Sequence, residues 1–246
     1  MRRSITALSI LCLGFASCLL ATEEDVPEER DSSAGLPKDY ASKYLIASST
    51  FSPDQKMAVM YPKDGEDEKA KDYLITLKPF KILSPLATDD PYFAHRSHGG
   101  ISAEWSKDSS VALVTLESKW GPGDILLYEM RDGKVTRETN MAKKIGDQLR
   151  PDYEKVKPES YNDSYNFILD DDLVADSGTD SSQPVKQCVL AGAQQVRVKA
   201  AATTDPKNIP GVKAWDAKFE GVWDIAQAKF TSAKVKRIVA GVRKDD

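Results

Sequence analysis

Residues 51–59 read FSPDQKMAV and residues 105–113 read WSKDSSVAL, so one nine-residue pattern returns without gaps at an offset of 54 residues. Each copy has an aromatic residue, a Ser-x-Asp turn and a run of apolar residues. In the first copy Pro53 presets φ, and the Ser and Asp side chains can accept hydrogen bonds from N–H groups that the turn leaves free. The pattern predicts two equivalent β units, each built around a tight turn.

The second copy predicts a complete four-stranded antiparallel meander. Its strands are expected at 101–105, 111–116, 125–130 and 134–139. Both faces of the strand from Val111 to Leu116 are largely apolar, so this strand should be covered on both sides. The fourth strand is polar except for Val135, as suits an edge strand. The first copy follows the same scheme, with strands expected at 44–48, 57–61, 73–77 and 81–86.

The motif resembles the blade repeat of periplasmic Tol-type and related WD-like β-propellers, in which the turn usually reads Ser-Pro-Asp-Gly-Lys. The resemblance covers residues 44–139 only. Gln55 and Ser109 stand where the family has Gly, and Lys107 replaces Pro in the second copy. The resemblance implies stacked four-stranded blades and a scaffold for binding, and it transfers no catalytic residue.

The length of the chain limits this resemblance. Closed propellers have about 4 to 8 blades, whereas this chain of 246 residues has two recognisable units and room for one further sheet. We therefore expect a mostly β fold of stacked four-stranded meanders that is open or incomplete, with one short helix. A sandwich, or a ring completed by a homo-oligomer, are the alternatives.

The segment after the two β units, residues 141–184, predicts a helix and a surface excursion. Asn140 can cap a helix in which Met141, Ile145 and Leu149 recur every four residues, and Pro151 should end it. The stretch 170–184 is rich in Asp, Ser and Gly and predicts a mobile loop.

The C-terminal unit, residues 185–246, predicts an antiparallel sheet of three or four strands. Apolar residues alternate with charged ones from Trp215 to Ile225, which indicates one buried and one wet face. Strands are expected before it at 196–202 and after it at 230–239. This sheet would close the end of the stack.

The first 21 residues are typical of a secretory signal peptide. Two arginines precede an apolar run that ends at Ala21. We expect cleavage between Ala21 and Thr22, which makes the protein secreted or periplasmic. In the alternative, Cys18 is lipidated and anchors the protein to a membrane. The following residues, 22–40, are acidic with scattered Pro, Ser and Gly, and they predict a flexible tether.

The composition favours no nucleic-acid partner. The whole chain has a net charge of −4. Residues 22–194 carry −11 and residues 195–246 carry +5. We expect the basic C-terminal unit to dock on the acidic body, and the alternative is a dedicated site for an anionic partner. After either processing route Cys188 is the only thiol left to pair, and its apolar neighbours indicate a buried packing cysteine.

Three side chains are the candidate ligand-binding residues. His95 and His98 lie on a Gly-rich connection before the second unit, and Trp120 lies in a turn where an inner core needs no large aromatic residue. A single His-x-x-His is a poor metal motif, so neither a metal nor another cofactor is expected. The acidic group Asp170, Asp171, Asp172 and Asp176 lacks the spacing of a calcium loop.

These observations predict an exported β-rich protein that binds a protein, peptide or glycan, or serves a structural role, rather than an enzyme. Its contact surface should be the loops around His95 to Gly100 and Trp120. The alternative is a secreted hydrolase or metal-dependent enzyme that uses His95 or His98. The familiar hydrolase and phosphate-binding motifs do not occur in the sequence.

Overall fold

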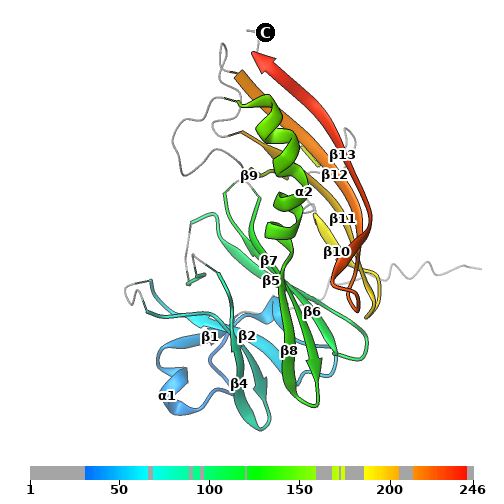
Figure 1. Ribbon diagram of the computed structural model, residues 1–246. Helices are drawn as coiled ribbons and strands as arrows, with labels where there is room; N and C mark the ends of the chain where they lie inside the picture. Colours follow the sequence, from blue (N-terminus) through cyan, green and yellow to red (C-terminus); the bar gives the residue numbers. More distant parts are fainter. Residues whose placement is uncertain are drawn as a thin grey trace, which may run out of the picture.

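A computed structural model describes residues 31–65, 69–88, 91–94, 97–119, 121–158, 168–171, 173–174, 186–204 and 213–242. The described chain is mostly β and forms three antiparallel sheets (Figure 1). The predicted fold class is therefore confirmed. Both signal-processing predictions, cleavage after Ala21 and lipidation of Cys18, lie outside the described residues.

The first two sheets are the two predicted four-stranded meanders, each with its strands in sequential order. The first sheet contains β1 (Tyr44–Ile46), β2 (Met57–Pro62), β3 (Tyr73–Leu77) and β4 (Phe80–Pro85). The second sheet contains β5 (Gly100–Trp105), β6 (Val111–Glu117), β7 (Pro122–Arg131) and β8 (Lys134–Asn140). A 3₁₀ turn, η1 (Ser48–Thr50), follows β1.

The repeated turns are equivalent in their hydrogen bonds. Ser52 and Ser106 are buried, and the hydroxyl of each accepts a hydrogen bond at 2.9 Å from the backbone N–H five residues later. The same hydroxyls donate at 2.7 Å to the Asp side chain two residues later. Gln55 and Ser109 both have positive φ, 58° and 57°. These are the two positions at which the similar family motif carries Gly.

The first two sheets pack face to face. Val59 and Leu74 of the first sheet share one core with Ala112, Val114 and Leu126 of the second. The opposite face of β6 belongs to a different core, which the second sheet shares with α2 and the third sheet. The prediction that this strand is covered on both sides is thus confirmed, and three sheets follow one another as layers.

The third sheet has five strands, one more than the largest number predicted. It contains β10 (Cys188–Leu190), β11 (Gln195–Thr203), β12 (Lys213–Asp224) and β13 (Lys229–Val242) in that order, and β9 (Ile168–Leu169) pairs with β11. The extra strand comes from the predicted excursion, which returns to the sheet and covers the end of β11.

Helix α2 (Met141–Val156) lies along the third sheet (Figure 1). The side chain of Asn140 caps it by accepting a hydrogen bond from the N–H of Lys143 at 2.9 Å, as expected. The prediction that Pro151 ends the helix is wrong, because the helix continues to Val156. Tyr153 and Val156 are buried in the core, and their packing offsets the roughly 3 kcal/mol that an internal proline costs.

An ion pair joins a basic residue of the C-terminal unit to an acidic residue of the preceding part of the chain, as the charge distribution predicts. Arg237 on β13 donates to both carboxylate oxygens of Asp152 on α2, at 2.6 and 2.9 Å. This hydrogen bonding lowers the pKa of Asp152 to about 2. The indole N–H of Trp215 on β12 donates to the same carboxylate at 2.9 Å.

The prediction that one face of β12 is solvent-exposed is wrong at Asp216, which is only 6% exposed. Its neighbour across the strand pair, Thr203, donates a hydrogen bond of 2.5 Å to the carboxylate and so compensates its burial. The opposite face is buried as predicted from Trp215 to Ile225.

The predicted flexible tether, residues 22–40, is wrong from Asp31 onward, and residues 22–30 lie outside the described chain. Asp31 accepts hydrogen bonds from Ser48 and Tyr61 of the first sheet, and Ser32 forms a β-bridge to Ile46. A four-residue helix, α1 (Lys38–Ala41), follows. Leu36 and Tyr40 pack on the outer face of the first sheet, a contact that a reading based on composition misses.

Replacing Gln55 by Gly should stabilise the protein by about 0.5–1 kcal/mol, since Gly adopts positive φ without the steric cost that a side chain adds. The control is Lys107→Gly, at a turn position without positive φ, which should destabilise by a similar amount. Urea unfolding measures both. A destabilised Gln55→Gly protein would contradict the strain at this turn.

Candidate functional site

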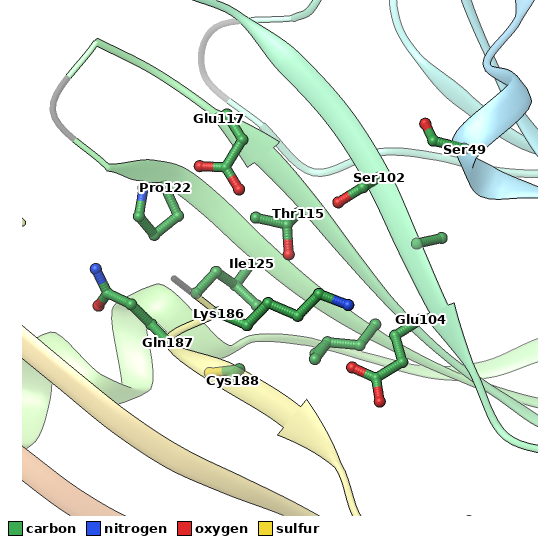
Figure 2. A pocket seen from close by; sticks show the side chains of 12 residues that line it. Ser49, Ser102, Glu104, Thr115, Glu117, Pro122, Ile125, Lys186, Gln187 and Cys188 are labelled. Carbon is green, nitrogen blue, oxygen red and sulfur yellow. The ribbon is translucent and has the colours of Figure 1, made fainter. Parts of the chain in front are cut away.

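A cavity of about 220 Å³ opens between the second and third sheets (Figure 2). Its walls come from η1, from β5 to β7 and from the residues that lead into β10. The lining residues are Ser49, Ser102, Ala103, Glu104, Leu113, Thr115, Glu117, Pro122, Ile125, Lys186, Gln187 and Cys188. Most of the polar groups are side chains of the second sheet. The floor of the cavity includes the core residues Leu113 and Ile125.

The alternation of β6 directs its side chains into this cavity. Leu113 is buried in the core with the third sheet, and Thr115 and Glu117 follow on the same face because strand side chains alternate. Ser102 of β5 is the register partner of Thr115, so the two hydroxyl side chains are cross-strand neighbours. The strand thus turns from apolar to polar along one face, and the cavity begins at that change.

Glu117 is the carboxyl group of the cavity whose pKa is shifted toward neutral pH. Desolvation by burial, followed by the nearby negative charge of Asp171, raises the pKa of this carboxyl to about 7. The unperturbed value is near 4.5. Such a group changes charge near neutral pH, and strongly perturbed groups in cavities are characteristic of functional sites.

A close backbone contact places Asp171 beside Glu117. Gly121, in the turn between β6 and β7, has φ +154°, and a Cβ there would lie 2.9 Å from the carbonyl oxygen of Leu169 and 3.3 Å from the N–H nitrogen of Asp171. Only Gly permits this approach without displacement. The chain leaving β9 therefore crosses directly over the rim of the cavity.

Gln187 forms part of the opposite wall and is 3% exposed. Its amide Nε2 donates to Asp171 Oδ1 at 2.6 Å. Its Oε1 accepts no hydrogen bond within the described part of the chain. A buried amide oxygen without a donor is unusual in a folded protein and requires an explanation.

Cys188 lies next to Gln187 and is a free, buried thiol with 4% exposure. Burial, and to a lesser extent the charge of Glu104, raises the pKa of the thiol well above its usual range. The thiolate is the reactive form, so the structure confirms the prediction of a packing cysteine.

The predicted contact loops lead to the two sides of Glu117. In the strand register Glu117 pairs with Gly100, which follows the His95–Gly100 loop, and with Pro122, which follows Trp120. His98 itself is exposed and has φ +57°. His95 and Trp120 lie outside the described residues.

Sequence reasoning missed Glu117 although a signal for it was present. The inward face of Val111, Leu113 and Thr115, continued by one more alternation, ends at Glu117. Nothing local in the sequence indicates that Asp171 and Gln187 lie beside it.

The acidic group after β9 is divided by the structure. Asp170 is fully buried, and Asp171 contacts Gln187. Asp172 and Asp176 lie outside the described residues. Where the structure does describe the chain, no three His, Cys, Asp or Glu side chains are grouped so that they could hold a metal ion.

Comparisons with protein-family models, curated proteins and solved structures find no match to this chain. None of the helices in the described ranges is long and apolar enough to cross a membrane.

Among the lining residues that the structure describes, no hydroxyl or thiol is hydrogen-bonded to a base. Nucleophilic catalysis requires a Ser, Thr or Cys side chain hydrogen-bonded to a base. The one hydrogen bond donated by a lining hydroxyl among the described residues goes from Ser49 to the carbonyl oxygen of Ile101, at 2.6 Å. The side chains of Ser102, Glu104 and Thr115 make no hydrogen bond to any described residue and face the cavity.

Replacing Glu117 by Gln should stabilise the protein at pH 8 and leave its stability nearly unchanged below pH 4.5. The folded pKa lies above the unfolded one, so the neutral carboxyl favours folding below pH 4.5, and that contribution is lost as pH rises through about 7. Gln imitates the neutral form at every pH. We expect about 1–2 kcal/mol at pH 8, after discounting for the part of the carboxyl that water reaches.

Urea unfolding at pH 4.5 and pH 8 measures this difference. Glu220→Gln is the matched control, because Glu220 is an exposed residue of β12. A pH-independent effect of Glu117→Gln would contradict the raised pKa.

Proposed function

We propose that this chain is an exported, non-enzymatic binding protein that holds a small polar ligand between its second and third sheets. The carboxyl of Glu117 carries the proposal, since it is partly buried and faces a cavity beside a second carboxylate, Asp171. That arrangement is unfavourable for the protein alone and becomes favourable when a ligand supplies compensating polar groups.

The lining has the composition of a ligand site. The apolar side chains of Leu113 and Ile125 belong to the core and form a preformed floor. Polar groups surround this floor, as in small-molecule sites where a few polar groups fix the orientation of a ligand. The volume, about 220 Å³, is below the roughly 300 Å³ at which drug-sized pockets begin, which favours a ligand of few atoms.

The two loops from the sequence analysis complete this proposal. The turn at Gly121 and the connection before Gly100 meet the strand ends that flank Glu117. Both loops are thus well placed to contact what enters the cavity. For the alternative, a hydrolase that uses His95 or His98, the described chain contains only His98, which is exposed.

Binding should raise the melting temperature of the purified protein, because a ligand that binds only the folded state stabilises it by mass action. We expect at least one class of small polar metabolite in a thermal-shift panel to give a saturable increase. Glu117→Gln should reduce that increase, and Glu220→Gln should not. If no class of compound shifts the wild-type protein, the binding function is contradicted.

Export predicts a defined mature N-terminus. Expression of the full chain in a secreting host should release a protein that begins at Thr22, and intact mass spectrometry measures this directly. Cys18→Ala should leave export and mass unchanged. A lipid-modified N-terminus at Cys18 would instead establish the anchored form.

A further inference from the structure

We infer that the free edge of β13 is a docking surface for an extended acidic peptide, whose acidic side chains lie beside Lys234 and Lys236 and whose apolar side chains cover Val235. The peptide adds one strand to the third sheet. This inference goes beyond the proposed function, because the edge is separate from the cavity, whose lining includes no residue of β13.

Strand β13 forms the outer edge of the third sheet (Figure 1). It pairs with β12 on one side, and no strand of the described ranges pairs with its other side. Such an edge presents a row of backbone N–H and C=O groups with which another extended chain can pair. Residues 231–238 are all exposed. Residues 232–237 pair with residues 217–222 between two register shifts, so they are the regular part of the edge.

The outer side of this edge is basic. In the strand register Lys234 is the partner of Glu220, and Lys236 is the partner of Lys218. Lys199 of β11 is the partner of Glu220 on its other side. Lysines therefore outnumber the acidic residue in these two rows of the sheet. A strand added beside β13 would place its own side chains opposite Lys234 and Lys236, where opposite charges are stabilising.

The inner side of the edge is apolar. Val235 is the register partner of Phe219, which is fully buried in the core that the third sheet shares with α2. Val235 itself is 37% exposed, because β13 is the last described strand over that core. The ring of Phe230, also on this side, lies 5.1 Å from that of Trp223. An apolar side chain of an added strand would cover Val235 and remove its surface from water.

The two sides of the edge fit a peptide in which acidic and apolar residues alternate, because successive side chains of a strand point to opposite faces. The acidic residues 22–30 of this chain do not alternate in this way. A second copy of β13 fits poorly, since antiparallel pairing about Val235 would place Lys234 of one copy opposite Lys236 of the other. The occupant is therefore an acidic segment of a different protein.

Fluorescence anisotropy with labelled synthetic peptides tests this inference on the full mature chain. The probe is a peptide of about eight residues that alternates glutamate and valine. Its controls alternate lysine and valine, or glutamine and valine. At an ionic strength of about 0.1 M, we expect the glutamate peptide to bind with a dissociation constant below ~100 μM. Both control peptides should bind at least about tenfold more weakly, and a glutamate peptide that does not bind overturns the inference.

Backbone methylation separates strand addition from attraction by charge alone. A glutamate–valine peptide with every backbone nitrogen methylated keeps its charges but has no N–H group to donate to β13. It should not bind. Equal binding of the methylated and unmethylated peptides would show that charge alone holds the peptide, which overturns strand addition.

Hydrogen exchange locates the bound peptide. Backbone amides of residues 232–237 that face the free edge should exchange more slowly when the glutamate peptide is bound. Amides of β4, an edge strand of the first sheet, should exchange at an unchanged rate. Protection at β4 without protection at β13 would place the peptide elsewhere and would overturn the inference.

Charge reversal tests the two lysines. The double variant Lys234→Glu with Lys236→Glu should weaken binding of the glutamate peptide by about tenfold or more and should strengthen binding of the lysine peptide. An unfolded variant could not exchange its preference in this way. The matched control is Lys81→Glu, at an exposed lysine of β4, and it should change neither affinity. An unchanged preference in the double variant contradicts the role of the lysines.

Other occupants of the edge give different results. A concentration-dependent dimer in which the amides of residues 232–237 are protected would show that a second copy covers the edge. Binding to phosphatidylglycerol vesicles without binding to the glutamate peptide would assign the basic side to a membrane. Either result overturns the inference. Neither involves the cavity, so the thermal-shift panel tests the proposed function separately.

Discussion

The structure depends on one strand, β6, being apolar on both faces. Ala112, Val114 and Leu116 face the first sheet, and Val111 and Leu113 face the third sheet and α2. At about 25 cal/mol per Å² of apolar surface, a strand buried on both sides contributes more than one packed on a single core. The two covering layers stack on opposite faces of this strand, which fixes the order of the three sheets.

The cavity lies where one face of β6 stops being apolar. Along the face turned toward the third sheet, apolar residues give way to Thr115 and then Glu117. On the opposite side lie Lys186 and Gln187, which lead into β10 of the third sheet. The two layers therefore face one another through polar groups instead of a dry core, so the site is a product of the same packing that stabilises the fold.

Local chemistry made the first two sheets predictable. The Ser-x-Asp turn encodes its own hydrogen bonds, and the strands next to it are short and alternate clearly. The prediction that the helix ends at Pro151 is wrong because the burial of Tyr153 and Val156, a tertiary effect, outweighs local propensity. The prediction that Asp216 is solvent-exposed is wrong for a similar reason. The hydrogen bond that allows its burial comes from Thr203, on another strand.

The site was less predictable than the fold. The loops that flank it could be found from Trp120 and the glycines near His98, whereas the alternation of β6 leads to Glu117 without indicating its partners. Glu117, Asp171 and Gln187 come from three separate parts of the chain, and the close approach at Gly121 helps to bring the first two together. No sequence period encodes a contact of that kind.

The pairing of β9 with β11 has a consequence for folding. The first two sheets are meanders of consecutive hairpins, which close short loops, whereas residues 168–169 must find residues 202–203 across a longer stretch of chain. Long-range pairings of this kind form slowly, since the loop entropy is lost before contacts compensate it. We therefore expect the meanders to form early and the region containing Asp171 to join them in the last kinetic step.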